Sequence, residues 1–308
     1  AGALVKDNTS TLTLSGTVAN TYSGGTTIND GTVSLGTGGG VTSHQDALGT
    51  GSVSVNSGGE LRLWISNTGS YTIDNAFTMD GGTVHGEDGL YDLTGAMTLA
   101  AGGGTLSGKW SGKGITVSGT ISGTGALTID EKAGGNGGEV TLTGANTYTG
   151  ATTINGGTLA FAGGGTISES SAIVINDTGT LRFDKNDTFG NANADTSSSI
   201  TINAGGTMES GGFFTTIRDL NLNGGTVALT GGVSATYPAL ALKGTVTVGG
   251  SQASQINYVS GNNSRISIGD NNLGATVFDV ADATGDASAD LTIGAVVQNN
   301  SPIGGNSL

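Results

Sequence analysis

The feature that most constrains the fold of this chain is a long internal repeat. A segment that begins at Asn20 as Asn-Thr-Tyr-Ser-Gly-Gly-Thr-Thr-Ile-Asn returns at Asn146 as Asn-Thr-Tyr-Thr-Gly-Ala-Thr-Thr-Ile-Asn, and the copies align there without a gap. Glycines punctuate both copies, and β-branched residues fill them. Such self-similarity is typical of stacked repeat architectures, in which each unit buries its apolar side against its neighbours.

Apolar and polar residues alternate strictly along much of the chain, as they do in strands with one buried face. Helical spacing is hard to find, and glycine, which supplies 59 of the 308 residues, interrupts nearly every window. The sequence therefore predicts an all-β protein. Typical alternating pairs are Leu12 and Leu14, Val53 and Val55, Leu61 and Leu63, Val140 and Leu142, and Ile200 and Ile202.

A second, shorter motif sets the length of each repeat unit. A strand ends in an asparagine, glycine follows, and an apolar residue comes a few positions later, with successive motifs about 22 residues apart. Asparagine and glycine adopt the left-handed backbone conformations that sharp corners need, and asparagines at one phase can stack as a ladder. The predicted structural corner residues are Asn29, Asn56, Asn155, Asn176, Asn203 and Asn223.

Asn-Gly-Gly between two strands also fits a β-hairpin. The repeat step is too long for a hairpin partner, however, and it suits a turn made of three short strands. Proline, with 2 residues, is nearly absent, as expected where each strand donates hydrogen bonds to the rungs beside it. The sequence thus predicts a right-handed parallel β-helix, a solenoid with roughly three short strands per rung.

This β-helix is expected to run over residues 1–250 and to contain the two long repeats, at 12–36 and 140–162. Residues 251–308 lack the Asn-Gly-Gly-Thr signal, so we expect them to continue the β-helix in looser rungs. Both ends of the sequence look cut. We therefore interpret the chain as a fragment of a longer solenoid.

Composition narrows the possible partners. The net charge is −14 and only ten residues are Lys or Arg, so phosphate repulsion disfavours nucleic acid as a partner. No apolar run is long enough to cross a membrane, so this segment is not expected to insert into one. The chain has no cysteine, which excludes disulfides and thiol chemistry.

The segments that begin at Asn20 and Asn146 resemble the autotransporter-associated β-strand repeat, which is found in passenger domains of bacterial type V secretion. Residues 47–61 are similar to the usual continuation of that repeat, and residues 278–293 resemble the stretch that commonly precedes another copy. The resemblance implies an extracellular β-helix on the bacterial cell surface, anchored in the outer membrane through a barrel that is not in this chain. It brings no catalytic residues, and it implies roles in folding and export, adhesion or biofilm formation.

A polysaccharide lyase or hydrolase is the alternative, because β-helices also carry such enzymes and hydrolases need clustered carboxylates. His85, in Val-His-Gly-Glu-Asp, is predicted to be a buried or loop histidine rather than a catalytic one. Arg182 with 184–187 is the nearest lyase-like group, and we interpret it as a polar loop. The chain is therefore expected not to be an enzyme and to bind no cofactor or metal.

Calcium is the one metal that the loops would suit, since it prefers oxygen ligands. The acidic candidates are Asp184 and Asp187 in one loop, and Asp279, Asp282, Asp286 and Asp290 in another. Solvated turns explain both groups, so no metal site is predicted.

Four aromatic residues, Trp64, Tyr71, Tyr91 and Trp110, fall within one stretch of rungs. They form either a sugar-stacking interaction surface or a cover over irregular loops. The leading hypothesis is a non-catalytic passenger segment whose long surface serves adhesion or self-association through many weak polar contacts. Its expected partners are a second copy of itself, or a protein or glycan of a host or matrix surface; an inert stalk is the remaining alternative.

Overall fold

The computed structural model describes residues 1–37, 44–65, 69–167, 172–186, 189, 199–231, 239–261, 264–268 and 275–299. All regular elements within these residues are β-strands. The same residues contain no helix long and apolar enough to cross a membrane. The chain divides into two compact units, Ala1–Leu159 and Ala160–Leu308, each of which is described by itself.

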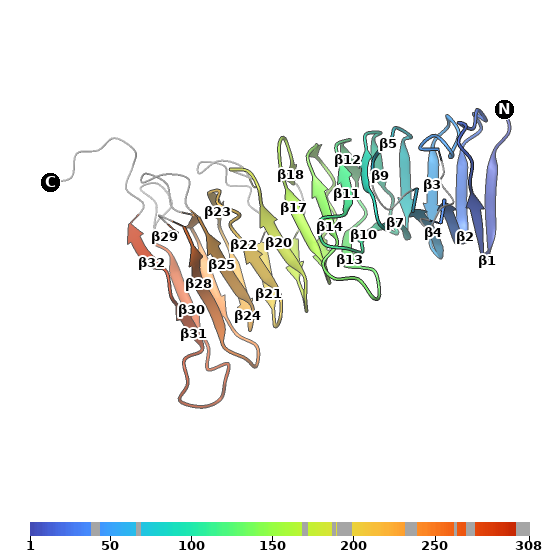
Figure 1. Cartoon of the computed structure of the whole chain (residues 1–308). Helices are drawn as coiled ribbons and strands as arrows, with labels where there is room; N and C mark the ends of the chain where they lie inside the picture. The colour runs from blue at the N-terminus through green and yellow to red at the C-terminus, as the bar shows by residue number, and fades with distance from the viewer. Residues whose placement is uncertain are drawn as a thin grey trace. The chain divides into compact units, whose positions relative to one another are not determined.

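The first unit is a stack of parallel strands on three faces (Figure 1). It opens with β1 (Leu4–Leu14) and β2 (Thr26–Leu35), and β2 is long enough to run along the first face and then the second. The first face continues with β3 (Val53–Asn56), β6 (Phe77–Asp80), β9 (Met97–Leu99), β12 (Ile121–Gly123) and β15 (Ala145–Asn146). The second face has β4 (Gly59–Leu63), β7 (Gly82–Gly86), β10 (Gly104–Gly108), β13 (Leu127–Glu131) and β16 (Thr152–Ile154). The third face has β5 (Ser70–Ile73), β8 (Leu90–Leu93), β11 (Gly114–Val117) and β14 (Glu139–Leu142).

The second unit repeats this plan, after β17 (Thr158–Phe161), which spans the boundary, and β18 (Thr166–Ile167). One sheet has β19 (Ala172–Ile175), β21 (Ser199–Asn203), β24 (Leu220–Asn223), β27 (Thr245–Val248) and β30 (Val277–Val280). Another has β20 (Thr180–Phe183), β22 (Thr207–Glu209), β25 (Thr226–Thr230), β28 (Ser254–Ser260) and β31 (Leu291–Ile293). The last has β23 (Thr215–Ile217), β26 (Leu240–Leu242), β29 (Arg265–Ile268) and β32 (Val296–Asn299).

The core of each unit is a set of apolar columns, because the alternating residues of successive strands stand directly above one another. On the second face of the first unit, no member of the central column is more than 1% exposed. Burying each such side chain contributes about 1.5–3 kcal/mol. The all-β parallel solenoid that the sequence predicts is thus confirmed, whereas the change to looser rungs beyond residue 250 stays a prediction. This column contains Val33, Leu61, Val84, Leu106, Ile129 and Ile154.

The two long repeats occupy different faces of the first unit. In the first copy, Thr26–Ile28 pairs with Val53–Val55 on the first face. In the second copy, Thr152–Ile154 pairs with Leu127–Ile129 on the second face. The number of residues per turn varies along the chain, so the same sequence returns one face later. The repeat therefore specifies a local strand and its corner, not a fixed face of the solenoid.

Both copies of the repeat build the same corner. The hydroxyl of Tyr22 lies 2.7 Å from Oγ1 of Thr26, and the hydroxyl of Tyr148 lies 2.7 Å from Oγ1 of Thr152. A tyrosine four residues before a strand thus satisfies the threonine hydroxyl that the strand buries. This hydrogen bond explains why the repeat pairs these two residue types at this spacing.

The glycine between the tyrosine and the threonine is required by a neighbouring rung. A Cβ at Gly24 would lie 2.6 Å from the carbonyl oxygen of Gly2, and a Cβ at Gly150 would lie 2.1 Å from that of Gly125. Both distances are far inside van der Waals contact, and the neighbouring atom is backbone, which cannot move aside. Glycine is therefore the residue that fits at this corner, because any side chain would clash with the backbone of the neighbouring rung.

Candidate functional site

Two of the predicted corner asparagines form a ladder in the first unit. Nδ2 of Asn56 donates to Oδ1 of Asn29 at 2.6 Å, and Nδ2 of Asn29 donates to Oδ1 of Asp7 at 2.6 Å. Each amide therefore donates toward the N-terminal rung. The ladder ends in a carboxylate, which only accepts hydrogen bonds and so suits the last position.

A second ladder lies in the second unit. Nδ2 of Asn223 donates to Oδ1 of Asn203 at 3.0 Å, and Nδ2 of Asn203 donates to Oδ1 of Asn176 at 2.6 Å. The sixth predicted corner residue, Asn155, follows β16 directly, and its backbone N–H donates to the carbonyl of Ile129. The asparagines of both ladders thus connect successive rungs.

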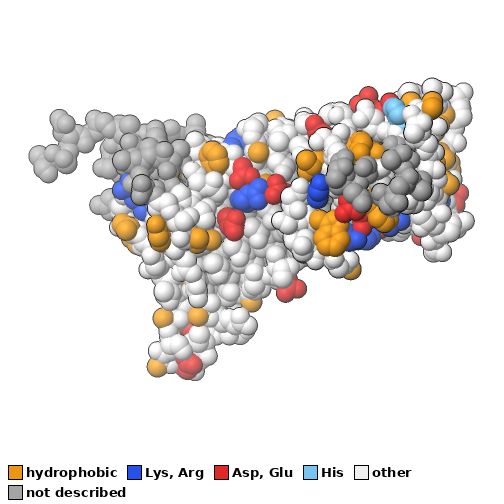
Figure 2. Space-filling model, in the orientation of Figure 1, with side chains coloured by type: hydrophobic (Ala, Val, Ile, Leu, Met, Phe, Trp, Pro, Cys, Tyr) orange, Lys and Arg blue, Asp and Glu red, His pale blue; other side chains and the backbone are white. Residues whose placement is uncertain are grey.

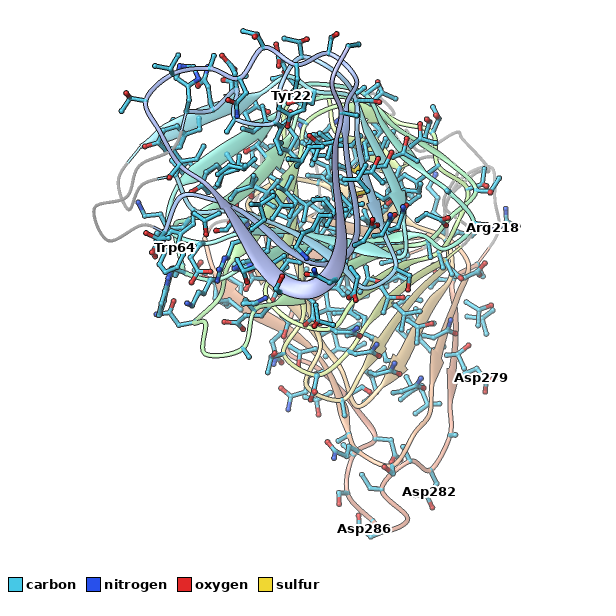
Figure 3. All side chains as sticks on the ribbon, turned by 90° about the vertical axis from the view of Figure 1, so that its right-hand side faces the viewer. Tyr22, Trp64, Arg218, Asp279, Asp282 and Asp286 are labelled. Carbon is cyan, nitrogen blue, oxygen red and sulfur yellow. The ribbon has the colours of Figure 1, made fainter. Side chains whose placement is uncertain are left out.

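The aromatic residues lie further along the first unit, and Trp64 is the clearest of them. It follows β4 at an outward position and is half-buried, and Figure 3 shows it at the edge of the molecule. Its indole N–H donates to Oδ2 of Asp88 on the next rung at 2.9 Å. The guanidinium of Arg62 lies 5.2 Å from the ring centroid, within range of a cation–π interaction.

Trp110 is held by a tight turn after β10. Its carbonyl accepts a hydrogen bond from the backbone N–H of Lys113, and the ammonium of Lys109 lies 5.0 Å from its ring centroid. The loop after β13 supports this turn, because Oδ1 of Asn136 accepts from the N–H of Ser111. Like Trp64, Trp110 is half-buried.

The two tyrosines form a stacked pair on the third face, with ring centroids 5.7 Å apart. Tyr71 is half-buried, but Tyr91 is only 1% exposed. The hydroxyl of Tyr91 accepts a hydrogen bond from the backbone N–H of Ile65, directly after Trp64. Tyr91 therefore does not belong to the interaction surface predicted from the sequence, because it is buried. Its hydroxyl instead holds the backbone at Ile65, next to Trp64.

A buried polar cluster lies beside the tryptophans. Nδ1 of His85 is 3.0 Å from Oγ of Ser107, and its Nε2 is 2.9 Å from Oε2 of Glu87. The other carboxylate oxygen of Glu87 accepts from Nζ of Lys109. His85 is 0% exposed, Glu87 3% and Ser107 4%, which confirms that His85 is a buried histidine.

Burial also sets the protonation of this cluster. Burial lowers the pKa of His85 below its usual 6.5, and this effect outweighs the hydrogen bond to Glu87, which raises it. For Glu87, burial raises the pKa, but the hydrogen bonds from Lys109 and His85 outweigh it and hold the carboxyl below its usual range. The cluster is therefore a neutral imidazole beside an ionised carboxylate.

The line of hydrogen bonds from Ser107 through His85 to Glu87 resembles a catalytic nucleophile with its base and the carboxylate that orients the base. Ser107 is covered, however, and the register explains why these residues meet. Ser107 and His85 stand at the same corner position on successive rungs, in a column that also contains Arg62 and Ser34. Nε of Arg62 donates to Oγ of Ser34 at 3.3 Å, so the corner column connects rungs as the asparagine ladders do.

Several of the other acidic candidates from the sequence make local contacts. Arg182 makes a bidentate ion pair with Asp184, at 2.7–3.0 Å, and Asp187 lies outside the described residues. In the loop after β30, Asp290 accepts from the N–H groups of Ala283 and Thr284. Figure 3 shows Asp282 and Asp286 in the projecting part of that loop, with Asp279 at a distance from both. No group of three or more His, Cys, Asp or Glu side chains in the described ranges could hold a metal ion.

Sequence reasoning did not assign Asp88, Glu87 and Lys109 to the aromatic surface. The available signal was the break in alternation at residues 84–88, where the apolar Val84 is followed by His85, Glu87 and Asp88 with one glycine between them. That break predicts an unusual corner. It does not predict which rungs supply the partners.

The fold and its outward side chains define a parallel β-solenoid built from a recurring corner module. Residues 4–35 and 120–161 match the family model of the passenger-associated transport repeat, which overlaps both predicted repeats. This match and the solenoid together fit an autotransporter passenger domain with repeats. No curated protein and no solved structure gives a significant match to the chain. The repeat implies a secreted, cell-surface protein, and it suggests a non-catalytic repeat region.

Proposed function

We propose that this chain is a non-catalytic segment of an autotransporter passenger, and that its outer surface mediates association between copies on neighbouring cells. As the family resemblance implies, the proposal includes anchoring in the outer membrane through a barrel outside this chain, with the repeats aiding folding and export. The non-catalytic part rests on the burial of His85 and Ser107, the most enzyme-like pair in the described residues.

The observation that carries the proposal is a column of hydroxyls on the second face. Thr83, Thr105, Thr128 and Thr153 stand in register at outward positions, and each is half-buried. These uncharged groups offer a regular hydrogen-bonding surface on a chain whose net charge of −14 would otherwise keep copies apart. Each contact is weak, but a repeated surface engages many at once, which raises the overall affinity.

The test is display of the passenger on bacteria that lack other adhesins, followed by measurement of cell settling. We expect the displayed chain to aggregate the cells, and the triple variant Thr83→Lys, Thr105→Lys and Thr128→Lys to abolish aggregation by placing like charges on the interface. A matched control adds three lysines at exposed alanines of the loop after β30, as Ala281→Lys, Ala287→Lys and Ala289→Lys, which changes the net charge by the same amount and leaves the column intact. Aggregation that survives the column variant, or a purified chain that stays monomeric at high concentration in ultracentrifugation, would contradict the proposal.

A further inference from the structure

The two tryptophans follow the ends of two strands of the second face, β4 and β10, which lie two rungs apart in the first unit. Leu63, Gly86 and Gly108 are partners on three successive rungs. Trp64 follows Leu63 directly, and Trp110 follows Gly108 after one intervening residue, Lys109. Neighbouring strands lie about 4.8 Å apart, so the two strands that precede the tryptophans are separated by about 10 Å along the stack. Figure 2 shows that hydrophobic side chains lie beside basic and acidic ones on the face of the molecule that it draws.

The charges around the indoles balance. We define the indole patch as Arg62, Trp64, Asp88, Lys109 and Trp110, and Glu87 below it pairs with Lys109. Two cations thus face two carboxylates, on a chain that is strongly acidic overall. The patch therefore favours neither a polyanion nor a cation, and it offers aromatic faces together with hydrogen-bonding groups at their edges.

A shallow pocket adjoins the turn of Trp110. Its volume is about 140 Å³, and Leu90, which is 47% exposed, contributes an apolar wall. Oγ1 of Thr141 donates to Oε1 of Glu139 at one side, so a hydroxyl and a carboxylate lie at the rim. This volume is below the roughly 300–1,000 Å³ of a drug-sized ligand site and suits the edge of one small ring. The pocket is lined by Leu90, Gly112, Lys113, Gly114, Glu139 and Thr141.

We propose that the indole patch and this pocket bind a neutral, hydroxyl-rich glycan chain. Trp64 and Trp110 stack on separate sugar rings, Asp88 and Lys109 bind hydroxyls between them, and the pocket holds the edge of a further ring. Three features of this surface support the proposal: two aromatic platforms, balanced charge, and a small pocket with polar edges. The site differs from the threonine column, so this inference goes beyond self-association and does not depend on it.

The chain provides its own probe, because Trp64 and Trp110 are its two tryptophans. Titration of the full chain with cellohexaose and with maltohexaose should change the tryptophan emission saturably for at least one of them. Trp64→Ala and Trp110→Ala should each weaken binding at least tenfold by calorimetry. Tyr258→Ala, which removes a 52% exposed aromatic from the second unit, is the matched control and should leave binding unchanged.

Asp88→Asn is a second variant for the case in which a tryptophan variant misfolds. It keeps an acceptor for the indole N–H but removes the charge, so the fold should persist while binding weakens. The inference is overturned if neither neutral oligosaccharide binds at millimolar concentration, if polygalacturonate binds more tightly, or if the Tyr258 variant loses as much affinity. Cell aggregation separates the two proposals, because the tryptophan variants should still aggregate cells.

Discussion

Replacing Glu87 with alanine removes the central carboxylate of the buried cluster. Glu87 is 3% exposed, and its two oxygens accept from His85 and from Lys109. The variant leaves a buried imidazole nitrogen and a partly covered ammonium without this acceptor. Removing one member of a buried ion pair costs about 3–5 kcal/mol, because the remaining charge is left uncompensated. The side chain of Lys109 is 22% exposed, and water therefore offsets part of this cost, so we expect a loss at the lower end of that range.

A matched control is Glu60→Ala, which removes another glutamate paired to a lysine. Oε2 of Glu60 lies 2.6 Å from Nζ of Lys132, but the side chains are 21% and 36% exposed. A partly exposed pair of this kind is screened by water and contributes about 0–1 kcal/mol. The two variants therefore differ mainly in burial, and the first should cost several times more than the second.

Urea unfolding followed by tryptophan emission measures this difference, because both tryptophans lie beside the cluster and report on the rungs around it. With a slope of about 1–3 kcal/mol per molar urea, the expected loss lowers the midpoint by at least about 1 M for Glu87→Ala. Glu87→Gln, which keeps the shape and one acceptor, should fall between the two. If Glu87→Ala lowers the midpoint no more than Glu60→Ala, the reasoning from burial is refuted.

Three further outcomes are expected. Burial lowers the pKa of His85, so the unfolded chain binds more protons and stability should fall as pH falls through about 6.5; a His85→Asn variant, followed by urea midpoints between pH 7.5 and 5.5, should lose that dependence. Asn203→Asp should destabilise the second unit more than Asn203→Ala, because a carboxylate cannot donate to the amide oxygen of Asn176 and places a negative charge beside it. Amide hydrogen exchange in β21 and β24 measures this difference, and faster exchange in the alanine variant than in the aspartate variant would contradict the prediction. Tyr148→Phe removes one hydrogen bond of the buried hydroxyl of Thr152 and should cost about 0.5–1.5 kcal/mol in thermal unfolding, more than the same change at its half-buried counterpart in the first repeat; equal effects would count against the argument.

Much of the fold was accessible from the sequence because it depends on short-range patterns. Period-two alternation predicted that Leu61 and Leu63 are buried, and an asparagine followed shortly by glycine predicted that Asn56 and Asn203 stand at corners. The repeat itself contains its corner, since the tyrosine and the threonine that it bonds are four residues apart. The alternation, the corner asparagines and the Tyr–Thr pair can be predicted from the sequence because each depends on residues only a few positions apart.

The candidate site depended on contacts between rungs, which sequence patterns do not specify. In the sequence, Tyr91 and Trp64 were equivalent candidates for the aromatic surface. In the structure, Tyr91 is buried and its hydroxyl accepts a backbone hydrogen bond, whereas Trp64 faces outward. The partner of the Trp64 indole, Asp88, lies on the next rung, and His85 meets Ser107 only because their rungs are in register. Loop lengths vary from turn to turn, so a repeat in the sequence returns on another face. The sequence by itself therefore determined the strand, the corner and the buried column, because residues close along the chain decide those, whereas the stacking of turns alone decided which outward side chains became neighbours.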